Sequence, residues 1–423
     1  MWRLIDFLYV GVLIGYALAG VQLTPFHGDE STTIYTSSDF DTLFLRGDLA
    51  HIIYRQPPPS DDPQAATKQD LRILNGVLSK YTYGFARWVS GLDTLPLNGQ
   101  WIWGASWDYN QAQGNLPSPL ILFVTRWASA LLLALSIAFV FASSVRLGGY
   151  RSAYLATLVS TLMPAVMLNG RRAVYESAAL LTEVLLFYVT LQLISRRATF
   201  KGALALGLAA GLAIAAKHTG VLFAVAAAGS MMLYPLLRLK IRQLFNTGLM
   251  IFGAGVIAAL TFLAFNASWW SQPLAMPGIV LARRIVITNT QADLFGEFQN
   301  PLQRISALVN ESLSAPPQYY EAGAEWQTWI GDQIARYEAS GLAGASGIIW
   351  RIVVGLLILV GLARMLIKWR QASTFALLFW FGLLAISLYA LTPFDWQRYY
   401  LPLTIPLALL GGMTFATKPV TER

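Results

Sequence analysis

Long apolar stretches separated by short polar segments dominate the hydrophobic pattern of this chain. A helix needs about 20 mostly apolar residues to cross the hydrocarbon core of a bilayer. Ten runs approach that length, and we predict a membrane helix in each of them: Leu4–Val21, Pro119–Phe141, Ser152–Leu168, Val174–Ile194, Gly202–Ala216, Val221–Leu237, Phe245–Ser268, Gly347–Leu366, Phe375–Leu391 and Leu401–Phe415.

The first run has an alternative interpretation as a cleaved signal peptide. Arg3 precedes it, and Ala17-Leu18-Ala19 resembles a signal-peptidase site. We favour a retained helix, because the residues directly after it have the character of a functional site.

Charged residues separate between the two sides of the predicted bundle. The side of the N-terminus carries 14 basic and two acidic residues in short connections, and the rest of the chain carries 16 basic and 20 acidic residues. Because Lys and Arg accumulate in cytoplasmic loops, we predict cytoplasmic termini for this multi-pass protein. The outer side then holds two long segments, 24–118 with 95 residues and 271–346 with 76 residues. A simple carrier or channel usually has less polypeptide outside the membrane.

Composition supports the same fold class. Of 423 residues, 56% are hydrophobic and 12% are charged, whereas soluble domains have about 25% charged residues. These values argue against a cytosolic enzyme, a disordered regulator or a fibre, and they indicate an all-α polytopic membrane protein with one domain over residues 1–423. The net charge of +8 is explained by membrane orientation, so we predict the bilayer and no nucleic acid as a partner. The absence of Cys excludes disulfides and thiolate sites.

The two outer segments contain further helical and aromatic patterns. Residues 71–92 and 326–337 have the amphipathic pattern of helices that lie in the membrane interface. We expect the tryptophans of these segments to form an aromatic belt at the interface. They are Trp101, Trp103, Trp107, Trp326 and Trp329. Gly207 and Gly211 form a GxxxG pattern that suits close helix packing.

The first candidate for chemistry is the sequence His27-Gly28-Asp29-Glu30, a few residues beyond the first run. Two adjacent carboxylates at a membrane surface can serve as a general base with a metal ligand, or as a base with its orienting partner. The alternative is a solvated loop in which Asp29 or Ser31 caps a short helix.

The second candidate group opens the fourth run. Arg172 and Glu176 are four residues apart and share a helix face, with Arg171 beside them. Glu183 lies about 10 Å deeper on nearly the same face. An acid inside a span is costly and usually has a partner, and Arg126 in the second run has a suitable depth. A purely structural buried ion pair is the alternative.

Two further groups lie at the outer ends of helices. Lys217 and His218 end the fifth run; the lysine either reaches towards lipid headgroups or binds an anionic phosphate, and the histidine is a metal ligand, a base or an ordinary interface residue. Arg398, Tyr399 and Tyr400 precede the last run. Arg can bind phosphate in a bidentate way, and the Tyr rings suit either a sugar face or an interfacial belt.

All four groups lie on the predicted outer side, which suggests a site for a membrane-bound phosphorylated substrate. No Gly-rich nucleotide loop, HExxH or GxSxG motif occurs, so soluble nucleotide chemistry and proteolysis gain no support. A transporter or flippase of lipid-linked sugars would place its polar groups near the midplane. A non-catalytic subunit of a membrane complex is the other alternative.

Several motifs follow one another in a recognisable order. They are Asp29-Glu30, Tyr35, Gly47-Asp48, Pro57-Pro58, Arg126-Trp127-Ala128-Ser129-Ala130-Leu131, Gly211-Leu212-Ala213 with Lys217, and Arg398-Tyr399-Tyr400-Leu401-Pro402. This order resembles the GT-C glycosyltransferases of the protein O-mannosyltransferase and aminoarabinose-transferase type. The chain differs from that pattern at Ala216, where Thr is usual, and at His218, where Gly is frequent, and it lacks the usual His-Pro-Pro.

The resemblance implies a GT-C bundle of about ten transmembrane helices that transfers a sugar from a polyprenyl or dolichyl phosphate. The resemblance also implies that the acceptor is a hydroxyl of a protein, lipid or glycan at the outer face. It implies that Asp29 is the general base of an inverting transfer, and that Glu30 orients Asp29, holds a divalent metal ion or contacts the acceptor. The residues implied for the donor phosphate are Lys217 and Arg398, then Arg171 or Arg172, and those implied for substrate contacts are Tyr399, Tyr400, Glu176 and His218.

Overall fold

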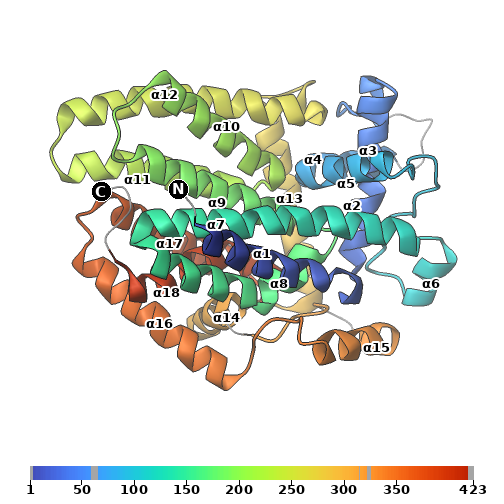
Figure 1. The fold of residues 1–423 in the computed structure, drawn as a ribbon. Coiled ribbons are helices and arrows are strands. Elements are labelled where there is room, and N and C mark those ends of the chain that lie inside the picture. Colours follow the sequence, from blue (N-terminus) through green and yellow to red (C-terminus); the bar gives the residue numbers. More distant parts are fainter. Residues whose placement is uncertain (1–2, 59–64, 314, 322–324, 418–423) are drawn as a thin grey trace.

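The computed structural model of the chain describes residues 3–58, 65–313, 315–321 and 325–417. Its regular structure within these ranges is helical, and no strand occurs there. The long helices run side by side across Figure 1, and short helices gather at its right-hand side. We call this side the loop end. It contains α2 (Gly28–Thr36), α3 (Ser38–Phe40), α4 (Ala65–Leu74), α5 (Leu78–Val89), α6 (Trp107–Ala112) and α15 (Trp326–Ala339).

The predicted apolar runs are confirmed as helices. The bundle consists of α1 (Leu4–Ala19), α7 (Pro119–Leu162), α8 (Pro164–Arg171), α9 (Glu176–Leu193), α10 (Phe200–Ala216), α11 (Gly220–Leu237), α12 (Ile241–Phe265), α16 (Ile348–Ile367), α17 (Ala372–Leu391) and α18 (Gln397–Gly412). In the described part of the chain, seven helices are long and apolar enough to cross a membrane, and α10 is a shorter apolar helix. The second long segment adds α13 (Met276–Phe295) and α14 (Pro301–Leu313).

Helix α7 contains two of the predicted spans, because it turns back on itself. Gly149 has φ 79° and ψ −176°, a conformation that a side chain disfavours. The rings of Phe141 and Tyr154 lie 5.7 Å apart, whereas 13 residues of straight helix would separate them by about 20 Å. The sharp turn therefore replaces the short polar connection that the sequence predicts between the two spans.

Proline divides the third predicted run. Pro164 begins α8, and the preceding Met163 is extended with φ −67° and ψ 120°. Proline disfavours a helical conformation of the residue before it and cannot donate the usual hydrogen bond. Helix α8 is therefore a separate segment of eight residues that carries Arg171 at its end.

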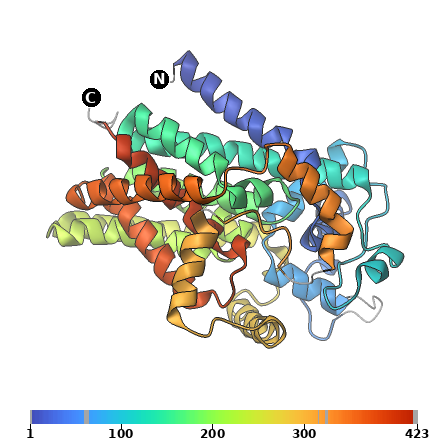
Figure 2. The same ribbon diagram turned by 90° about the horizontal axis from the view of Figure 1, so that it is seen from below.

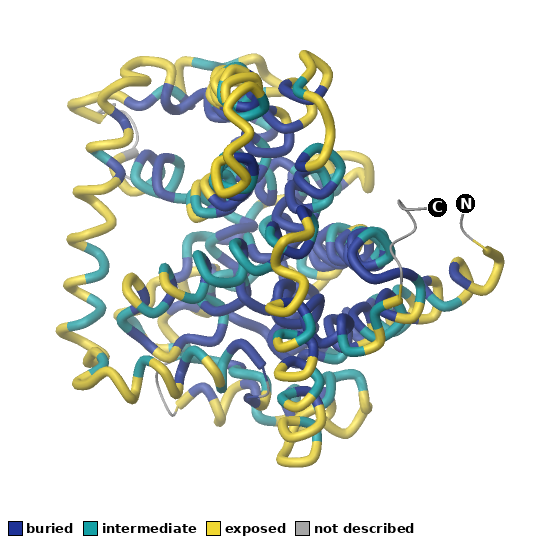
Figure 3. The backbone as a smooth tube through the Cα atoms, turned by 90° about the vertical axis from the view of Figure 1, so that its left-hand side faces the viewer, coloured by how far each residue is buried: buried dark blue, intermediate teal, exposed yellow. Residues whose placement is uncertain are grey.

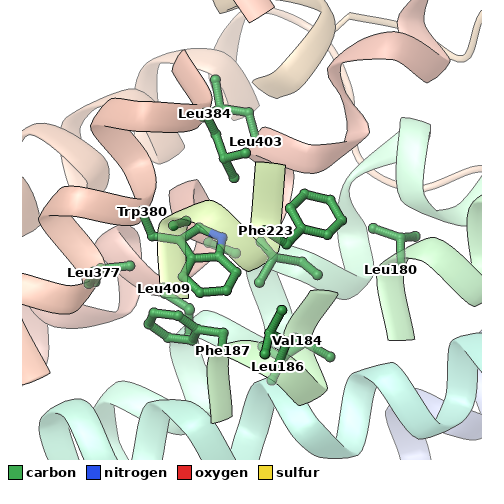
Figure 4. Packing of buried hydrophobic residues seen from close by; sticks show 14 of the residues in the cluster. Leu180, Val184, Leu186, Phe187, Phe223, Leu377, Trp380, Leu384, Leu403 and Leu409 are labelled. Atoms are coloured by element: carbon green, nitrogen blue, oxygen red, sulfur yellow. The ribbon is translucent and has the colours of Figure 1, made fainter. Parts of the chain in front are cut away.

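The core of the bundle surrounds Trp380 of α17 (Figure 4). The Phe187 ring meets it edge-on at 5.1 Å between centroids, and the Phe223 ring stacks at 6.4 Å. Leu384 and Leu403 complete the packing from α17 and α18. These contacts join α9, α11, α17 and α18, and these helices also carry residues to the loop end.

Helices α10 and α12 approach each other closely at the predicted glycine pattern. A Cβ atom on Gly207 would lie 2.6 Å from the Ala254 carbonyl oxygen, and one on Gly211 would lie 2.7 Å from that of Ala258. Side chains at these positions would force the helices apart. The GxxxG pattern therefore has the packing function that the sequence predicts.

Apolar side chains also cover the outside of the bundle. Helix α12 leaves Leu249, Phe252 and Leu260 exposed on its outer face, and exposed positions recur on the outward sides of the helices in Figure 3. Such a surface is stable in contact with lipid, where apolar side chains lose no hydration free energy.

The predicted interfacial segments are helical. Residues 71–92 correspond to the end of α4 and to α5, and residues 326–337 correspond to α15. Figure 2 shows α15 near the short helices of the first segment, while α1 runs along α7. The two long segments thus meet at the loop end, and they bring residues that are far apart in sequence to one place.

Candidate active site

Asp29 lies in the first turn of α2, close to the helix N-terminus. His27 is the residue that caps this helix, and its Nδ1 atom accepts a hydrogen bond of 3.1 Å from the Asp29 backbone N–H. The positive end of the helix dipole stabilises a carboxylate at this position. The Asp29 side chain keeps 24% of its surface exposed. It therefore combines a fixed backbone with a solvent-accessible carboxylate.

Four charged or polar side chains surround this carboxylate. The Trp103 indole N–H donates to Asp29 Oδ1 at 3.2 Å, and the Arg398 guanidinium forms an ion pair with Oδ2. Arg398 Nε also lies 3.1 Å from Glu321 Oε1. His27 Nε2 in turn lies 2.7 Å from Glu321 Oε2. These contacts form a continuous ring of interactions from Asp29 through Arg398, Glu321 and His27.

Glu321 is a member of this ring that the sequence did not indicate. It lies in an irregular part of the second long segment, and no motif marks it. Burial raises the pKa of Glu321 to about 7, although Arg172 opposes this change. Burial, together with Arg172 and Arg398, lowers the pKa of His27 well below its usual value. His27 is therefore neutral at pH 7, with the Nε2 proton directed at Glu321.

Glu30 has a structural role that differs from the predicted one. Its side chain is buried and binds Arg126 in a bidentate way, at 2.7 Å from Nε and 2.6 Å from Nη2. The backbone N–H groups of Ala173 and His27 donate to the same carboxylate. Burial alone would raise the pKa of Glu30, but the Arg126 guanidinium lowers it below its usual value. The prediction that Glu30 contacts the reacting groups has no support in this geometry.

The prediction that Arg126 is the partner of Glu183 was wrong. Arg126 binds Glu30 rather than Glu183. Glu183 is buried in α9, and its Oε1 atom has no hydrogen-bond partner among the described residues. The predicted proximity of Arg172 and Glu176 on one helix face was also wrong, because α9 begins only at Glu176.

Arg171 does not face the site. Its guanidinium donates to the carbonyl oxygens of Ala17 and Tyr16, each at 2.7 Å, and to the Tyr337 hydroxyl at 2.7 Å and the Leu342 carbonyl. The side chain is fully buried. These contacts hold α1 and α15 together, so the prediction of a phosphate contact by Arg171 is corrected to a structural role.

Arg172 supports the site from behind. Its Nε donates to the Pro25 carbonyl at 3.2 Å, and its Nη2 donates to the Tyr319 carbonyl at 2.7 Å. Each carbonyl lies two residues before a member of the ring, His27 in one case and Glu321 in the other. Arg172 is buried and does not reach the exposed surface. It is a positioning residue rather than a direct phosphate ligand.

Lys217 and Glu176 form an ion pair near this ring. Lys217 ends α10, Glu176 begins α9, and Nζ lies 3.0 Å from Oε1. The Lys217 side chain is 28% exposed and lines a cavity of about 260 Å³. Arg284 of α13 and Tyr399 also line this cavity. Arg284 is a second cation of the cavity that the sequence did not indicate.

The walls of this cavity away from Lys217 and Arg284 are mainly apolar. Leu222, Leu388, Leu391 and Pro402 contribute to them. Positive charge beside an apolar channel matches an amphipathic lipid that carries a phosphate. We call this space the cationic cavity.

His218 lines the same cavity, although its ring nitrogens are buried and have no hydrogen-bond partner among the described residues. The ring lies 5.7 Å from that of Trp269 and 6.1 Å from that of Phe262. Burial lowers the pKa of His218 to about 4, with Arg284 adding to this effect. His218 is therefore neutral at pH 7 and packs as an aromatic residue.

The two adjacent tyrosines point to different places. Tyr399 lines the cationic cavity, and its ring lies 5.6 Å from the Arg398 guanidinium carbon. Tyr400 is buried, and its hydroxyl donates to the Phe394 carbonyl at 2.9 Å. Tyr399 therefore stays a candidate for substrate contact, whereas the prediction for Tyr400 is corrected to a structural role.

A second cavity of about 500 Å³ lies on the other side of the segment that precedes α18. Pro393 and Phe394 line both cavities. The second cavity contains only acidic residues among its charged lining groups, and we call it the acidic cleft. These acids are Glu297, Glu311, Glu321 and Asp395. Two spaces of opposite charge thus share the wall formed by Pro393 and Phe394.

The tryptophans of the loop end pack against one another in a cluster. Trp101, Trp103, Trp107 and Trp326 have ring centroids 5.3 to 6.3 Å apart in five pairs. A Cβ atom on Gly28 would lie 2.6 Å from the Trp101 ring, so glycine permits this close packing. The cluster fixes Trp103, which donates to Asp29.

The side chains near Asp29 do not suit a divalent metal ion. In the part of the chain that the structure describes, no group of three or more His, Asp or Glu side chains is arranged to hold one. The Arg398 guanidinium provides the positive charge between the carboxylates of Asp29 and Glu321. The residues around Asp29 therefore do not fit the divalent metal ion that the sequence suggested as a candidate cofactor.

Comparison with known proteins agrees with this architecture. Residues 98–270 match the family model "Dolichyl-phosphate-mannose-protein mannosyltransferase", and no curated protein sequence matches the chain. The structure is similar to that of ArnT from Cupriavidus metallidurans, with a TM-score of 0.52 and 13% identity over 96% of this chain and 58% of that one. It is also similar to the archaeal oligosaccharyltransferase AglB from Archaeoglobus fulgidus, with a TM-score of 0.51 and 11% identity.

The AglB likeness covers 96% of this chain and 50% of that chain, so the present chain spans between half and three fifths of the length of these two proteins. At such low identity the likeness concerns the fold. The apolar helices and the family match together define an integral membrane protein. The matching segment is thus similar to a family of membrane mannosyltransferases, and the fold is similar to those of ArnT and AglB.

Proposed function

We propose that this protein transfers a sugar from a polyprenyl phosphate to an acceptor hydroxyl, with inversion at the anomeric carbon. The observation that carries the proposal is the position of Asp29. Its accessible carboxylate forms an ion pair with Arg398, which also contacts Glu321 of the acidic cleft and directly precedes Tyr399 of the cationic cavity. The family match and the AglB structure, which is described as a complex with an inhibitory peptide and a dolichol-phosphate, support this class of reaction.

The cationic cavity is the proposed place of the lipid phosphate. Lys217 and Arg284 offer charge-assisted hydrogen bonds to phosphate oxygens. The apolar wall, which includes Leu388 and Pro402, suits the prenyl chain. Tyr399, whose ring lies 5.6 Å from the Arg398 guanidinium carbon, is the proposed contact to the sugar.

The acidic cleft is the proposed entry of the acceptor, whether it is a protein, a lipid or a glycan. It contains Glu321, which belongs to the ring of interactions around Asp29. An acceptor hydroxyl that enters from this side reaches the anomeric carbon opposite to the phosphate. That approach is the geometry of an inverting displacement.

The reaction then has one base and one leaving group. The acceptor oxygen attacks the anomeric carbon and forms the new glycosidic bond, while the bond from that carbon to the phosphate oxygen breaks. The acceptor proton passes to the Asp29 carboxylate, and polyprenyl phosphate departs with the bonding electron pair. Phosphate needs no proton to leave, so fixed positive charge stabilises its departure in place of a general acid.

Arg398 connects the donor to the base. In the structure its guanidinium neutralises Asp29 and Glu321. We infer that a bound donor phosphate attracts this guanidinium and releases the Asp29 carboxylate for proton transfer. Substrate binding would thus raise the basicity of Asp29 when the acceptor is in place.

The charge distribution along the sequence supports an outer-face site. The basic connections opposite to the loop end favour a cytoplasmic location for both termini. The loop end then faces the outer side, where a lipid-linked donor is accessible from the outer leaflet.

The test uses purified protein in liposomes with a radiolabelled polyprenyl-phosphate sugar and a panel of acceptors. A transferase consumes the donor and labels an acceptor, and Asp29→Asn stops both. Movement of intact donor across the bilayer would show a transporter instead. If the donor stays intact on one side of the bilayer whichever acceptor is added, the protein is a non-catalytic subunit. Transport of the donor or its retention would each overturn the proposal.

A further inference from the structure

Basic residues gather at the end of the bundle that lies opposite to the loop end. This basic side faces the viewer in Figure 3. They come from the connections between α9 and α10, α11 and α12, and α16 and α17. Two adjoining cavities of about 730 and 560 Å³ lie there, and both are lined by Ser195 and Arg196. We call this surface the basic end, defined by Arg196, Arg197, Arg238, Lys240, Arg242 and Arg370.

Within the described part of the chain, no acidic side chain neutralises the basic end. Among the described residues, no carboxylate lines either cavity, and none of the six basic side chains forms an ion pair. The loop end differs sharply, because Asp29, Glu30 and Glu176 each pair with a cation there. Like charges held together without counter-charges favour the binding of an anion.

Two helix N-termini add to this positive potential. Helix α12 begins after Lys240 and α17 begins after Gln371, and neither residue caps its helix through its side chain. Neither first turn contains an acidic residue. The first turns line the cavities, through Ile241 and Gln243 in one and Ala372 in the other. Free N–H groups at a helix N-terminus are suited to phosphate oxygens.

Exposed apolar side chains beside the cavities indicate what kind of anion binds. Phe200 is 77% exposed at the start of α10, and Phe245 is 66% exposed in the second turn of α12. In an integral membrane protein such side chains meet acyl chains. A soluble anion would make no use of this apolar surface, whereas a lipid uses both the charge and the apolar surface.

We propose that the basic end binds the phosphate headgroup of an anionic phospholipid, with its acyl chains along α10 and α12. Membrane orientation alone requires basic residues in these connections, but it does not require them to line shared cavities together with uncapped helix N-termini. This lipid site is separate from the cationic cavity. Helix α10 has 17 residues between the two places, which corresponds to about 25 Å.

The test measures thermal unfolding of the purified full chain in neutral detergent during titration with phosphatidylglycerol. Phosphatidylcholine and inorganic phosphate are titrated in parallel. The triple variant Arg196→Gln, Arg197→Gln, Arg242→Gln removes three exposed cations of the basic end. The matched control Arg151→Gln, Lys201→Gln, Lys368→Gln removes three exposed cations of the same end that line neither cavity.

We expect phosphatidylglycerol to raise the Tm of the wild type and of the control variant, with phosphatidylcholine and inorganic phosphate having little effect. The triple variant should bind phosphatidylglycerol roughly a hundredfold more weakly, because each basic residue near an anionic headgroup contributes about a fivefold factor.

Three results would overturn the proposal. One is an equal response of the triple variant and the control, which would show a diffuse charge effect. Another is an equal rise of the Tm with inorganic phosphate alone, which would show a site for a soluble anion. The third is a rise with a poly-glutamate peptide but not with phosphatidylglycerol, which would show a protein-binding surface.

Discussion

Asp29 and Glu30 are adjacent acids with opposite expected responses to the same substitution. We predict that Asp29→Asn abolishes sugar transfer with little change in stability, and that Glu30→Gln destabilises the protein. Each variant removes one negative charge and keeps the shape of the side chain, so each is the matched control of the other. The difference arises from burial, because Asp29 is 24% exposed and Glu30 is fully buried.

The structure sets the magnitudes. Glu30 accepts from two guanidinium nitrogens of Arg126 and from two backbone N–H groups. Removal of one partner of a buried ion pair costs about 3–5 kcal/mol, because the other charge stays buried without compensation. With the unfolding entropy of globular proteins, this corresponds to a Tm lower by roughly 3–6 °C for a chain of this length. The partly exposed pair of Asp29 with Arg398 contributes at most about 1 kcal/mol.

The expected loss of transfer in Asp29→Asn is about 10²- to 10⁴-fold, which is the usual contribution of a general base. The assay combines donor turnover under saturating donor and acceptor with a thermal unfolding curve for each variant. Near wild-type turnover of Asp29→Asn would refute its role as the base. A Glu30→Gln variant with wild-type stability and abolished turnover would refute the separation of the two roles.

Three other predictions follow from neighbouring contacts. Lys217→Ala should raise the donor KM more than the acceptor KM, because it removes a cation from the cationic cavity. Lys201→Ala, at the far end of the same helix, is the control. An unchanged donor KM in Lys217→Ala would contradict the phosphate contact. Glu321→Gln should remove an acid-side decrease of transfer near pH 7, since burial raises the pKa of Glu321 to about 7 and its protonation below that pH leaves Arg398 paired with Asp29 alone. Because the pKa of Glu321 is about 7 in the folded state and 4.5 in the unfolded chain, the unfolded chain loses this proton first, and the free energy of unfolding falls as pH rises from 4.5 to about 7. Urea unfolding of Glu321→Gln should lack this fall. A fall of the same size in the variant would assign it to another group. Gly207→Leu should lower the Tm far more than Gly255→Leu, because a side chain at Gly207 meets the α12 backbone whereas one at Gly255 meets open space, and equal Tm values would contradict the close packing of α10 and α12.

Much of the bundle was predictable because the bilayer imposes a simple requirement. Each span must satisfy its backbone hydrogen bonds internally and present apolar side chains, and this requirement leaves a pattern of about 20 residues. Helix ends were less predictable. The turn at Gly149 and the break at Met163 depend on single residues that punctuate one long apolar stretch.

The partners of the charged residues were far less accessible from the sequence. Arg126 was expected near Glu183, yet it binds Glu30, which is 96 residues away. Arg171 and Arg172 have the composition of a phosphate site, but the loop end uses both to hold backbone carbonyls. A motif specifies residue types and spacing, whereas the partner of a long side chain depends on how separate segments fold over one another.

The sequence by itself determined an all-α membrane protein, its ten apolar runs and the place of Asp29 directly after the first of them. These properties follow from local pattern and from the cost of polar groups in hydrocarbon. Only the tertiary structure decided that Glu321 joins Asp29, His27 and Arg398, and that Arg284 joins Lys217. Burial and charge pairing act through space, so a carboxylate acquires its role from the groups that surround it in the folded chain.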